Sequence, residues 1–198
     1  MEIYLVKYSG LFGFIKPWTA VRDELTFSQQ FLTESMIFGI ERKLFPELLK
    51  EPYGIQKITG YRLTYDAIGE QQEKVQTRGY NIKGTKNRKL YERPTSILKR
   101  GVLINPVLYL VFDNEEDAQQ AATQHLCLTR NEDILYPEGE IMRTTVDDFN
   151  SSEEYSGFEL VFEKNESSFL TGYNRFNEAS PMYGWLRIVG TPIKEFYD

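Results

Sequence analysis

Cations and tyrosines are concentrated in one short stretch of this chain. Between Arg78 and Arg100 the sequence has eight Lys and Arg residues, one acid and two tyrosines. Cations can neutralise phosphates and tyrosine rings can stack on nucleobases, so the stretch has the residue types of a nucleic-acid contact. The other interpretation is a solvated surface loop, because a basic run does not by itself specify a ligand. The candidate contacts in it are Arg78, Tyr80, Lys83, Lys86, Arg88, Lys89, Tyr91 and Arg93.

The charge of the whole chain conceals this stretch. The 198 residues carry a formal net charge of −6, which as an average disfavours a nucleic-acid binder. Residues 78–100 alone carry +7, which leaves −13 on the rest. An acidic remainder repels free nucleic acid, so we expect the isolated chain to bind RNA weakly and to face solvent or basic protein subunits elsewhere.

Four further residues are candidate RNA contacts outside the basic stretch. Lys16, Trp18 and Arg22 follow the first predicted strand, and Trp18 could stack on a base or pack against protein. Arg130 lies where the last predicted strand ends. Its guanidinium could bind a phosphate or pair with the acids at 132–133, and the sequence leaves both open.

Few residues suit catalysis or metal binding. One histidine, His125, and one cysteine, Cys127, exclude a disulfide framework and a multi-cysteine zinc site. Cys127 lies between two leucines, which predicts a buried, inert thiol. The adjacent acids at 132–133 and 147–148 are typical of loops. We therefore expect no metal, no cofactor and no enzymatic activity.

Hydrophobic patterning predicts an alternation of strands and helices. Asn114 is a candidate N-cap, and Pro46 and Pro106 should interrupt their elements. The main strands are predicted over 2–9, 55–66, 101–112 and 126–130, and the helices over 33–49 and 115–124. Further strands are predicted over 140–146, 158–163 and 183–189, with a polar loop over 147–154.

This order is β-α-β-β-α-β, which predicts an α+β, ferredoxin-like (RRM-like) domain. The basic stretch is inserted after the second strand as a hairpin or an extended loop. We place the ferredoxin-like domain at residues 1–133, the insertion at about 70–100, and a C-terminal β-rich extension of the same body at 134–198. No apolar run is long enough to cross a membrane, and residues 1–7 lack the pattern of a secretory signal, so we expect a cytoplasmic protein.

Several segments of residues 1–133 occur in an order that resembles a known family. They are strand 2–9 with Gly10-Leu-Phe-Gly-Phe-Ile-Lys-Pro-Trp18, Ser35-Met-Ile-Phe-Gly39, Ile55-Gln-Lys-Ile58, Tyr61-Arg-Leu, Arg93-Pro-Thr-Ser-Ile-Leu-Lys-Arg100, and Leu126-Cys-Leu-Thr-Arg-Asn-Glu-Asp133. Their order and spacing resemble the fifth family of CRISPR-associated (Cas) proteins, in the repeat-associated RAMP superfamily of RNA-binding proteins.

The resemblance implies a subunit that caps a Cascade-type, RNA-guided effector complex in antiviral defence. In that family the ferredoxin-like body binds the 5′ handle of the guide RNA (crRNA). A hairpin called the thumb packs against the RNA and the neighbouring backbone subunit. The basic insertion matches the thumb in position. The implied partners are therefore crRNA, the backbone subunit and the large subunit, with target DNA reached only through the complex.

Some members of that family also cut precursor RNA with a lysine and a histidine. Here His125 follows Gln124 instead of a lysine, so we expect no nuclease activity. Two other functions remain open at this point. The basic segment could dock an acidic protein partner, or the chain could be a crRNA-processing endoribonuclease.

Overall fold

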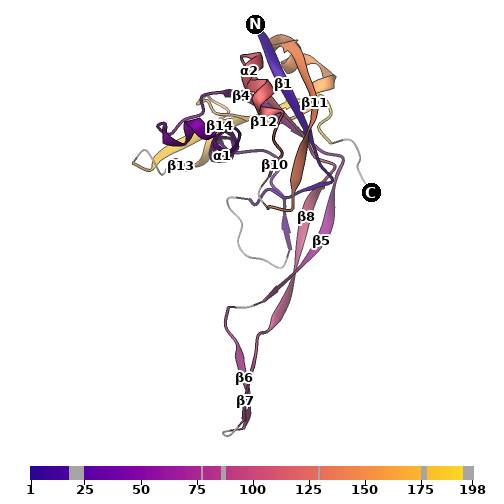
Figure 1. Cartoon of the computed structure of the whole chain (residues 1–198), viewed down its shortest axis with the longest axis vertical. Coiled ribbons are helices and arrows are strands. Elements are labelled where there is room, and N and C mark those ends of the chain that lie inside the picture. Colours follow the sequence, from indigo (N-terminus) through magenta and orange to yellow (C-terminus); the bar gives the residue numbers. More distant parts are fainter. Residues whose placement is uncertain (18–24, 77, 86–87, 129, 175–177, 194–198) are drawn as a thin grey trace.

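The largest element of the fold is an eight-stranded sheet in which all neighbouring strands are antiparallel (Figure 1). The computed structural model describes residues 1–17, 25–76, 78–85, 88–128, 130–174 and 178–193. In spatial order the strands are β10 (Leu126–Cys127), β11 (Ile134–Thr145), β1 (Glu2–Ser9), β9 (Val107–Phe112), β4 (Ile58–Thr64), β12 (Gly157–Val161), β14 (Ser180–Val189) and β13 (Phe169–Asn174). The protein is therefore of mixed α+β class.

Helices cover both faces of this sheet because alternate strand residues on each side are apolar. On one face α1 (Glu34–Leu44), the 3₁₀-helix η1 (Pro46–Lys50) and α2 (Glu115–Ala121) bury Leu110 and Phe112 of β9 in the larger core cluster. On the other face α3 (Val146–Ser151) and η2 (Glu153–Tyr155) pack on the alternate residues Tyr109 and Val111. As predicted, Asn114 caps α2, where its side chain accepts a hydrogen bond from the Asp117 backbone.

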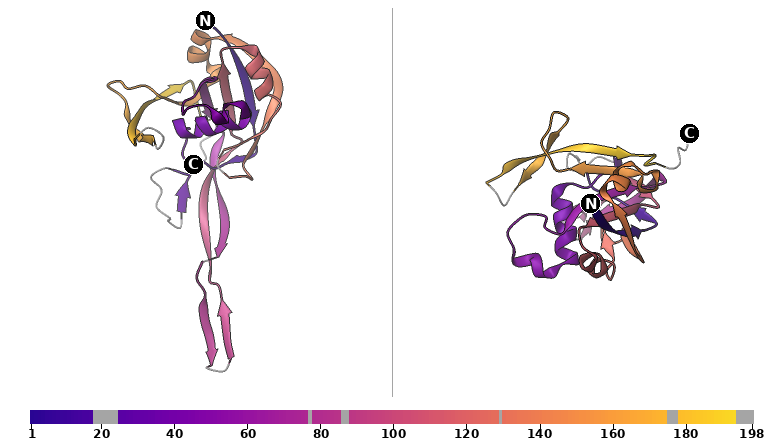
Figure 2. Two further views of the ribbon diagram at one scale, coloured as in Figure 1. Left: turned by 60° about the vertical axis from the view of Figure 1, so that its left-hand side comes forward. Right: turned by 90° about the horizontal axis from the view of Figure 1, so that it is seen from above.

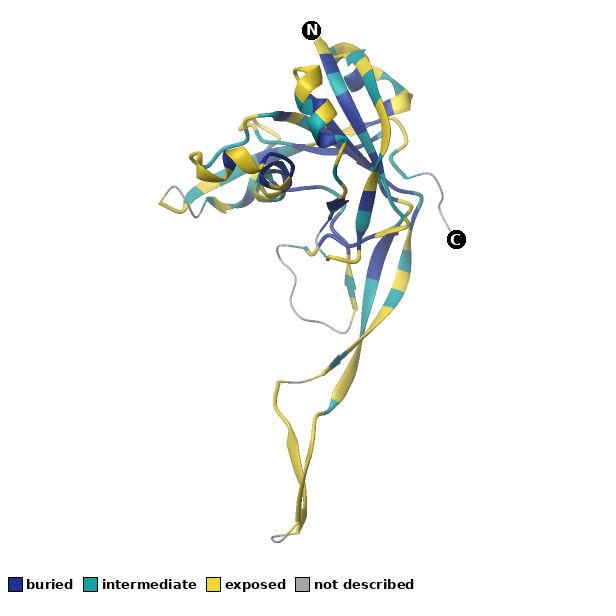
Figure 3. Ribbon diagram, in the orientation of Figure 1, coloured by how far each residue is buried: buried dark blue, intermediate teal, exposed yellow. Residues whose placement is uncertain are grey.

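A long hairpin continues from the middle of the sheet and projects away from the body (Figures 1 and 2). Strands β4 and β9 pair as far as Thr64 and Val107, and two-residue links then lead into the hairpin. Its shaft consists of β5 (Ala67–Gln76) and β8 (Thr95–Ile104), and its tip consists of β6 (Asn81–Thr85) and β7 (Arg88–Glu92). Figure 3 shows that the buried residues lie in the body and at the root of the shaft, whereas the tip is exposed throughout.

Two short strands flank the shaft at its root. β2 (Phe12–Gly13) pairs with Ile104 and Leu103, and β3 (Leu25–Phe27) runs parallel to β8. The ring of Phe27 lies over Gly101 so closely that a Cβ there would overlap it. Glycine at this position therefore lets the β3 segment approach the shaft.

The predicted elements differ from the structure in places. Pro106 interrupts the predicted strand 101–112 and Pro46 ends the first helix, as expected. The prediction of a loop over 147–154 was wrong, because Thr145 caps α3 and Phe149 is buried under it. Of the predicted strand 126–130, the described residues form the two-residue β10, and β13 was not predicted. No described helix has the length and hydropathy needed to cross a membrane.

Candidate nucleic-acid interface on the hairpin

The tip of the hairpin has two faces of different character. In its antiparallel register Ile82 lies opposite Tyr91, and Gly84 lies opposite Lys89. Because directly paired residues share a face, Ile82, Lys89 and Tyr91 lie on one side of the ribbon. Tyr80 joins them, since its ring contacts that of Tyr91 edge to face at a centroid distance of 5.3 Å. We call these four residues the aromatic face.

The side chains of the aromatic face are open to solvent. Tyr80 is 56% exposed, Ile82 60% and Tyr91 58%. Soluble proteins seldom expose large contiguous apolar groups unless the surface binds a partner. The sequence identified both tyrosines as candidates but not Ile82, whose place beside Tyr91 depends on the strand register.

The opposite face of the tip carries the only acid of the segment. Glu92 forms an ion pair with Lys83, so the charge of Lys83 is matched within the hairpin. Arg88 and the 63% exposed Leu90 lie on this face too. On this face the ion pair therefore matches the charge of Lys83 but not that of Arg88.

The shaft neutralises two more cations of the basic stretch. Lys99 pairs with Glu70 at 3.2 Å, and Arg100 pairs with Glu73 at 3.3 Å. Both acids belong to β5 and lie outside residues 78–100. The net charge of +7 counted over residues 78–100 includes Lys99 and Arg100, so it overstates the positive charge of the shaft. Residues 78–93 still hold six cations and one acid, so the positive charge is concentrated at the tip.

Four candidate cations of the hairpin have no ion pair within the described part of the chain, and all four are exposed. They are Arg78, Arg88, Lys89 and Arg93. Arg78 and Arg93 lie where the tip joins the shaft. At this junction four residues lie between β5 and β6, and two lie between β7 and β8. Lys86 lies outside the described residues.

Arg130 lies at the root of the hairpin and is held by protein groups. Its Nε and Nη2 donate to the two carboxylate oxygens of Asp133, each at 2.6 Å, and Nη2 also lies 3.3 Å from Gln71 Oε1 of β5. Asp133 is 1% exposed and also accepts the backbone N–H of Phe14 at 3.1 Å. Hydrogen bonding to Asp133 raises the pKa of Arg130, which stays charged. Of the two interpretations left open by the sequence, the structure contains the ion pair.

The other candidates outside the hairpin are less informative. Lys16 is exposed, whereas Trp18 and Arg22 lie outside the described residues. His125 is exposed and its ring lies 6.1 Å from that of Tyr136. Cys127 is only half-buried, contrary to the expectation of a buried thiol, because β10 lies at the edge of the sheet. The described residues contain no cluster of acids, histidine and cysteine that could hold a metal ion.

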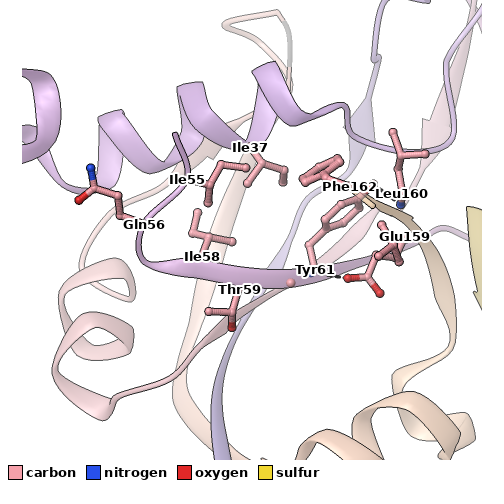
Figure 4. Close-up of a pocket in the computed structure, with 11 residues that line it drawn as sticks. Ile37, Ile55, Gln56, Ile58, Thr59, Tyr61, Glu159, Leu160 and Phe162 are labelled. Atoms are coloured by element: carbon pink, nitrogen blue, oxygen red, sulfur yellow. Dashed lines mark hydrogen bonds between the residues drawn. The ribbon is translucent and has the colours of Figure 1, made fainter. Parts of the chain in front are cut away.

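A pocket of about 290 Å³ beneath α1 is an alternative candidate site (Figure 4). It opens where β4 and β12 diverge after the single pair Phe158–Leu63, and Ile37, Ile58 and Phe162 supply apolar walls. Glu159 provides its carboxylate.

Arginines already occupy that carboxylate. Glu159 Oε2 accepts from Arg62 at 2.5 Å and from Arg187 at 3.2 Å. Burial lowers the pKa of Arg62 and raises that of Tyr61, whose hydroxyl bridges Leu32 and Leu160. A carboxylate held by two guanidinium groups is poorly suited to general acid–base catalysis, so these contacts serve to join the diverging strands.

Comparisons with known proteins give matches among solved structures. No protein-family model and no curated protein sequence matches the chain. Among solved structures, the fold is similar to a chain of a "CRISPR RNA-guided surveillance complex", with a TM-score of 0.51 and 12% identity. The match covers 96% of this chain and 90% of that chain. At this identity the match shows that the two chains have a similar fold.

Proposed function

We propose that this protein is a non-catalytic RNA-binding subunit of a Cascade-like CRISPR effector complex that binds the 5′ handle of the guide RNA through the hairpin. The observation that carries the proposal is the tip. Exposed tyrosines, an exposed isoleucine and unpaired cations lie together at the far end of a projecting hairpin. The fold similarity to a chain of an RNA-guided surveillance complex supports this context.

The body fits a ferredoxin-like core. Helix α1 connects β1 to β4, and α2 connects β9 to β11, while these four strands lie in the order β11–β1–β9–β4. Both connections cross over one intervening strand, which is the split β-α-β arrangement of that fold. The hairpin is then an insertion between the second and third strands of the core, the position of the thumb in the resembled family.

The geometry of the hairpin suits contact with an unpaired strand. The segment from Ala67 at the root to Thr85 at the end of β6 is nineteen residues long, so the tip can reach about 60 Å from the sheet. Single-stranded RNA offers phosphates for Lys89 and the arginines and open base faces for Tyr80 and Tyr91. The acidic body disfavours further contacts with free RNA, so protein subunits of the complex would hold the RNA in place.

Co-purification of the assembled complex tests this proposal. We expect the complex expressed with its neighbouring subunits to carry RNA, and to lose it when Lys83, Lys86, Arg88 and Lys89 are all replaced by Ala. Unchanged RNA in this variant would refute the role of the hairpin. If the variant instead loses a protein subunit while RNA remains bound elsewhere, the hairpin is a protein-docking element.

The absence of catalysis is a separate part of the proposal. Replacement of His125 by Ala should leave any RNA cleavage by the complex unchanged, because its imidazole has no hydrogen-bond or ion-pair partner among the described residues, and the nearby Lys43 ammonium binds the His125 backbone carbonyl instead of the ring. Loss of cleavage in that variant would identify the chain as a processing endoribonuclease.

A further inference from the structure

A second surface lies at the root of the hairpin, on the body. It is a groove of about 660 Å³ between the end of β1, the links that join sheet and hairpin, and the start of β11. We call it the root groove. The residues that line it include Leu11, Phe12, Asp66, Asn105, Glu132 and Tyr136.

Large apolar side chains line the root groove and remain exposed. Leu11 is 72% exposed, Tyr136 61% and Phe12 44%. Leu11 and Phe12 follow β1 whereas Tyr136 belongs to β11, yet the three surround the same hollow. Aromatic and aliphatic groups gathered in this way around a concave surface are typical of the anchor sites of protein interfaces.

The backbone that presents these side chains is firmly held. The Asn105 N–H donates to Leu11 O at 3.0 Å, and the Gly10 N–H donates to Pro106 O at 3.2 Å. The Asn105 amide also donates to Asp66 Oδ2 at 2.8 Å. A segment tied at both ends loses little conformational entropy when it binds, so the groove is prepared for a partner.

The charge of the root groove disfavours RNA, the ligand proposed for the tip. Among the described residues that line it, two carry carboxylates, Asp66 and Glu132, and none is Lys, Arg or His. Glu132 is 69% exposed, and its nearest cation, Arg130 Nε at 3.6 Å, is committed to Asp133. Phosphates would be repelled here. A peptide segment with cationic and apolar side chains would instead place its cations near the carboxylates and its apolar groups against the apolar lining.

We infer that the root groove docks a second protein through a segment in which Lys or Arg residues flank bulky apolar side chains. The inference rests on the proposed function only for the presence of partner subunits. The hairpin tip of a second copy also combines cations with bulky apolar side chains. A contact between that tip and the root groove would join two different surfaces, so it would form open chains instead of a closed assembly. The partner is therefore a different protein, which would sit beside the RNA where the hairpin leaves the body.

Nuclear magnetic resonance titration of the full-length, RNA-free chain tests this inference. The probe is a synthetic peptide in which lysines alternate with leucine and tyrosine, and the control peptide has glutamate in place of each lysine. We expect the lysine peptide to shift the amide signals of Leu11, Phe12 and Tyr136, and the glutamate peptide to leave them unchanged. Replacement of Leu11 by Ser should lower the affinity for the lysine peptide by about tenfold, because an anchoring side chain is lost.

Matched variants separate this result from the RNA proposal. Leu49→Ser alters a 67% exposed leucine of η1, outside the groove, and should leave peptide affinity unchanged. A chain in which Lys83, Arg88 and Lys89 are replaced by Ala should bind the peptide like the wild type, whatever its RNA affinity.

Several results would overturn the inference. They are no binding, equal binding of both peptides, shifts confined to other surfaces, or groove shifts caused by an oligouridylate RNA. Concentration-dependent groove shifts without any peptide would instead identify a second copy of the chain as the occupant.

Discussion

The salt dependence of RNA binding should distinguish the unpaired cations of the hairpin from the paired ones. Replacement of Arg78, Arg88, Lys89 and Arg93 by Ala removes the four described candidate cations of the hairpin that have no ion pair. Each phosphate contact on a single strand contributes about 0.7 to the slope of log affinity against log salt, so four contacts contribute about 3. Between about 50 and 200 mM salt the wild-type chain should lose about 50-fold more affinity than the variant.

The matched control for this experiment removes a charge pair. Lys83→Ala combined with Glu92→Ala leaves the net charge unchanged, because these two residues neutralise each other. The slope of this double variant should equal that of the wild type. The assay is the anisotropy of a fluorescent oligouridylate measured at several salt concentrations. Equal slopes for the fourfold variant and the wild type would refute the assignment of phosphate contacts to the unpaired cations.

Four further predictions concern single positions. Tyr91→Ala should weaken RNA binding by about 1–3 kcal/mol through loss of base stacking. Tyr173→Ala removes a tyrosine of similar exposure on β13 and should have no effect on RNA binding, so equal effects of the two substitutions would contradict a role for the aromatic face. Arg130→Ala should lower RNA affinity with an unchanged salt slope, because it positions the hairpin without contacting phosphate; a slope lower by about 0.7 would show a phosphate contact. Glu159→Gln should lower the free energy of unfolding, measured in urea, by about 3–5 kcal/mol, since it leaves two guanidinium groups without their carboxylate. A loss below about 1 kcal/mol would contradict the role of Glu159 in joining the diverging strands. Burial raises the pKa of Tyr65 to about 12, above its ordinary value of 10.0, so the stability from keeping this phenol neutral is complete below pH 10 and lost as pH rises toward 12. Tyr65→Phe should reduce that alkaline loss in thermal melts, and identical pH profiles would contradict it.

The sequence predicted the position of the hairpin because its composition changes sharply there. Arg78, Lys89 and the two tyrosines were identified from residue type alone. Their grouping could not be predicted, because the pairing of Ile82 with Tyr91 depends on a register that an exposed, weakly patterned hairpin does not encode. The neutralisation of Lys99 and Arg100 was missed for a similar reason, since their partners lie on the other strand of the shaft.

Arg130 and α3 show where local sequence is ambiguous. Asp133 is three residues from Arg130, so an ion pair was one of two reasonable interpretations. Only the 1% exposure of Asp133 and its bond to Phe14 favour the ion pair. The segment 147–154 is polar enough for a loop, yet one buried phenylalanine and the Thr145 cap fold it against the sheet. The root groove was not predicted, because its residues come from distant parts of the chain.

Ultraviolet crosslinking of the assembled complex, followed by mass spectrometry of the peptides, tests the central claim most directly. If the hairpin binds guide RNA through its aromatic face, RNA adducts should form on Tyr80 or Tyr91, and they should be absent when Arg78, Arg88, Lys89 and Arg93 are replaced by Ala. Adducts found only on the body of the protein, or none on this chain in a complex that holds RNA, would contradict the claim.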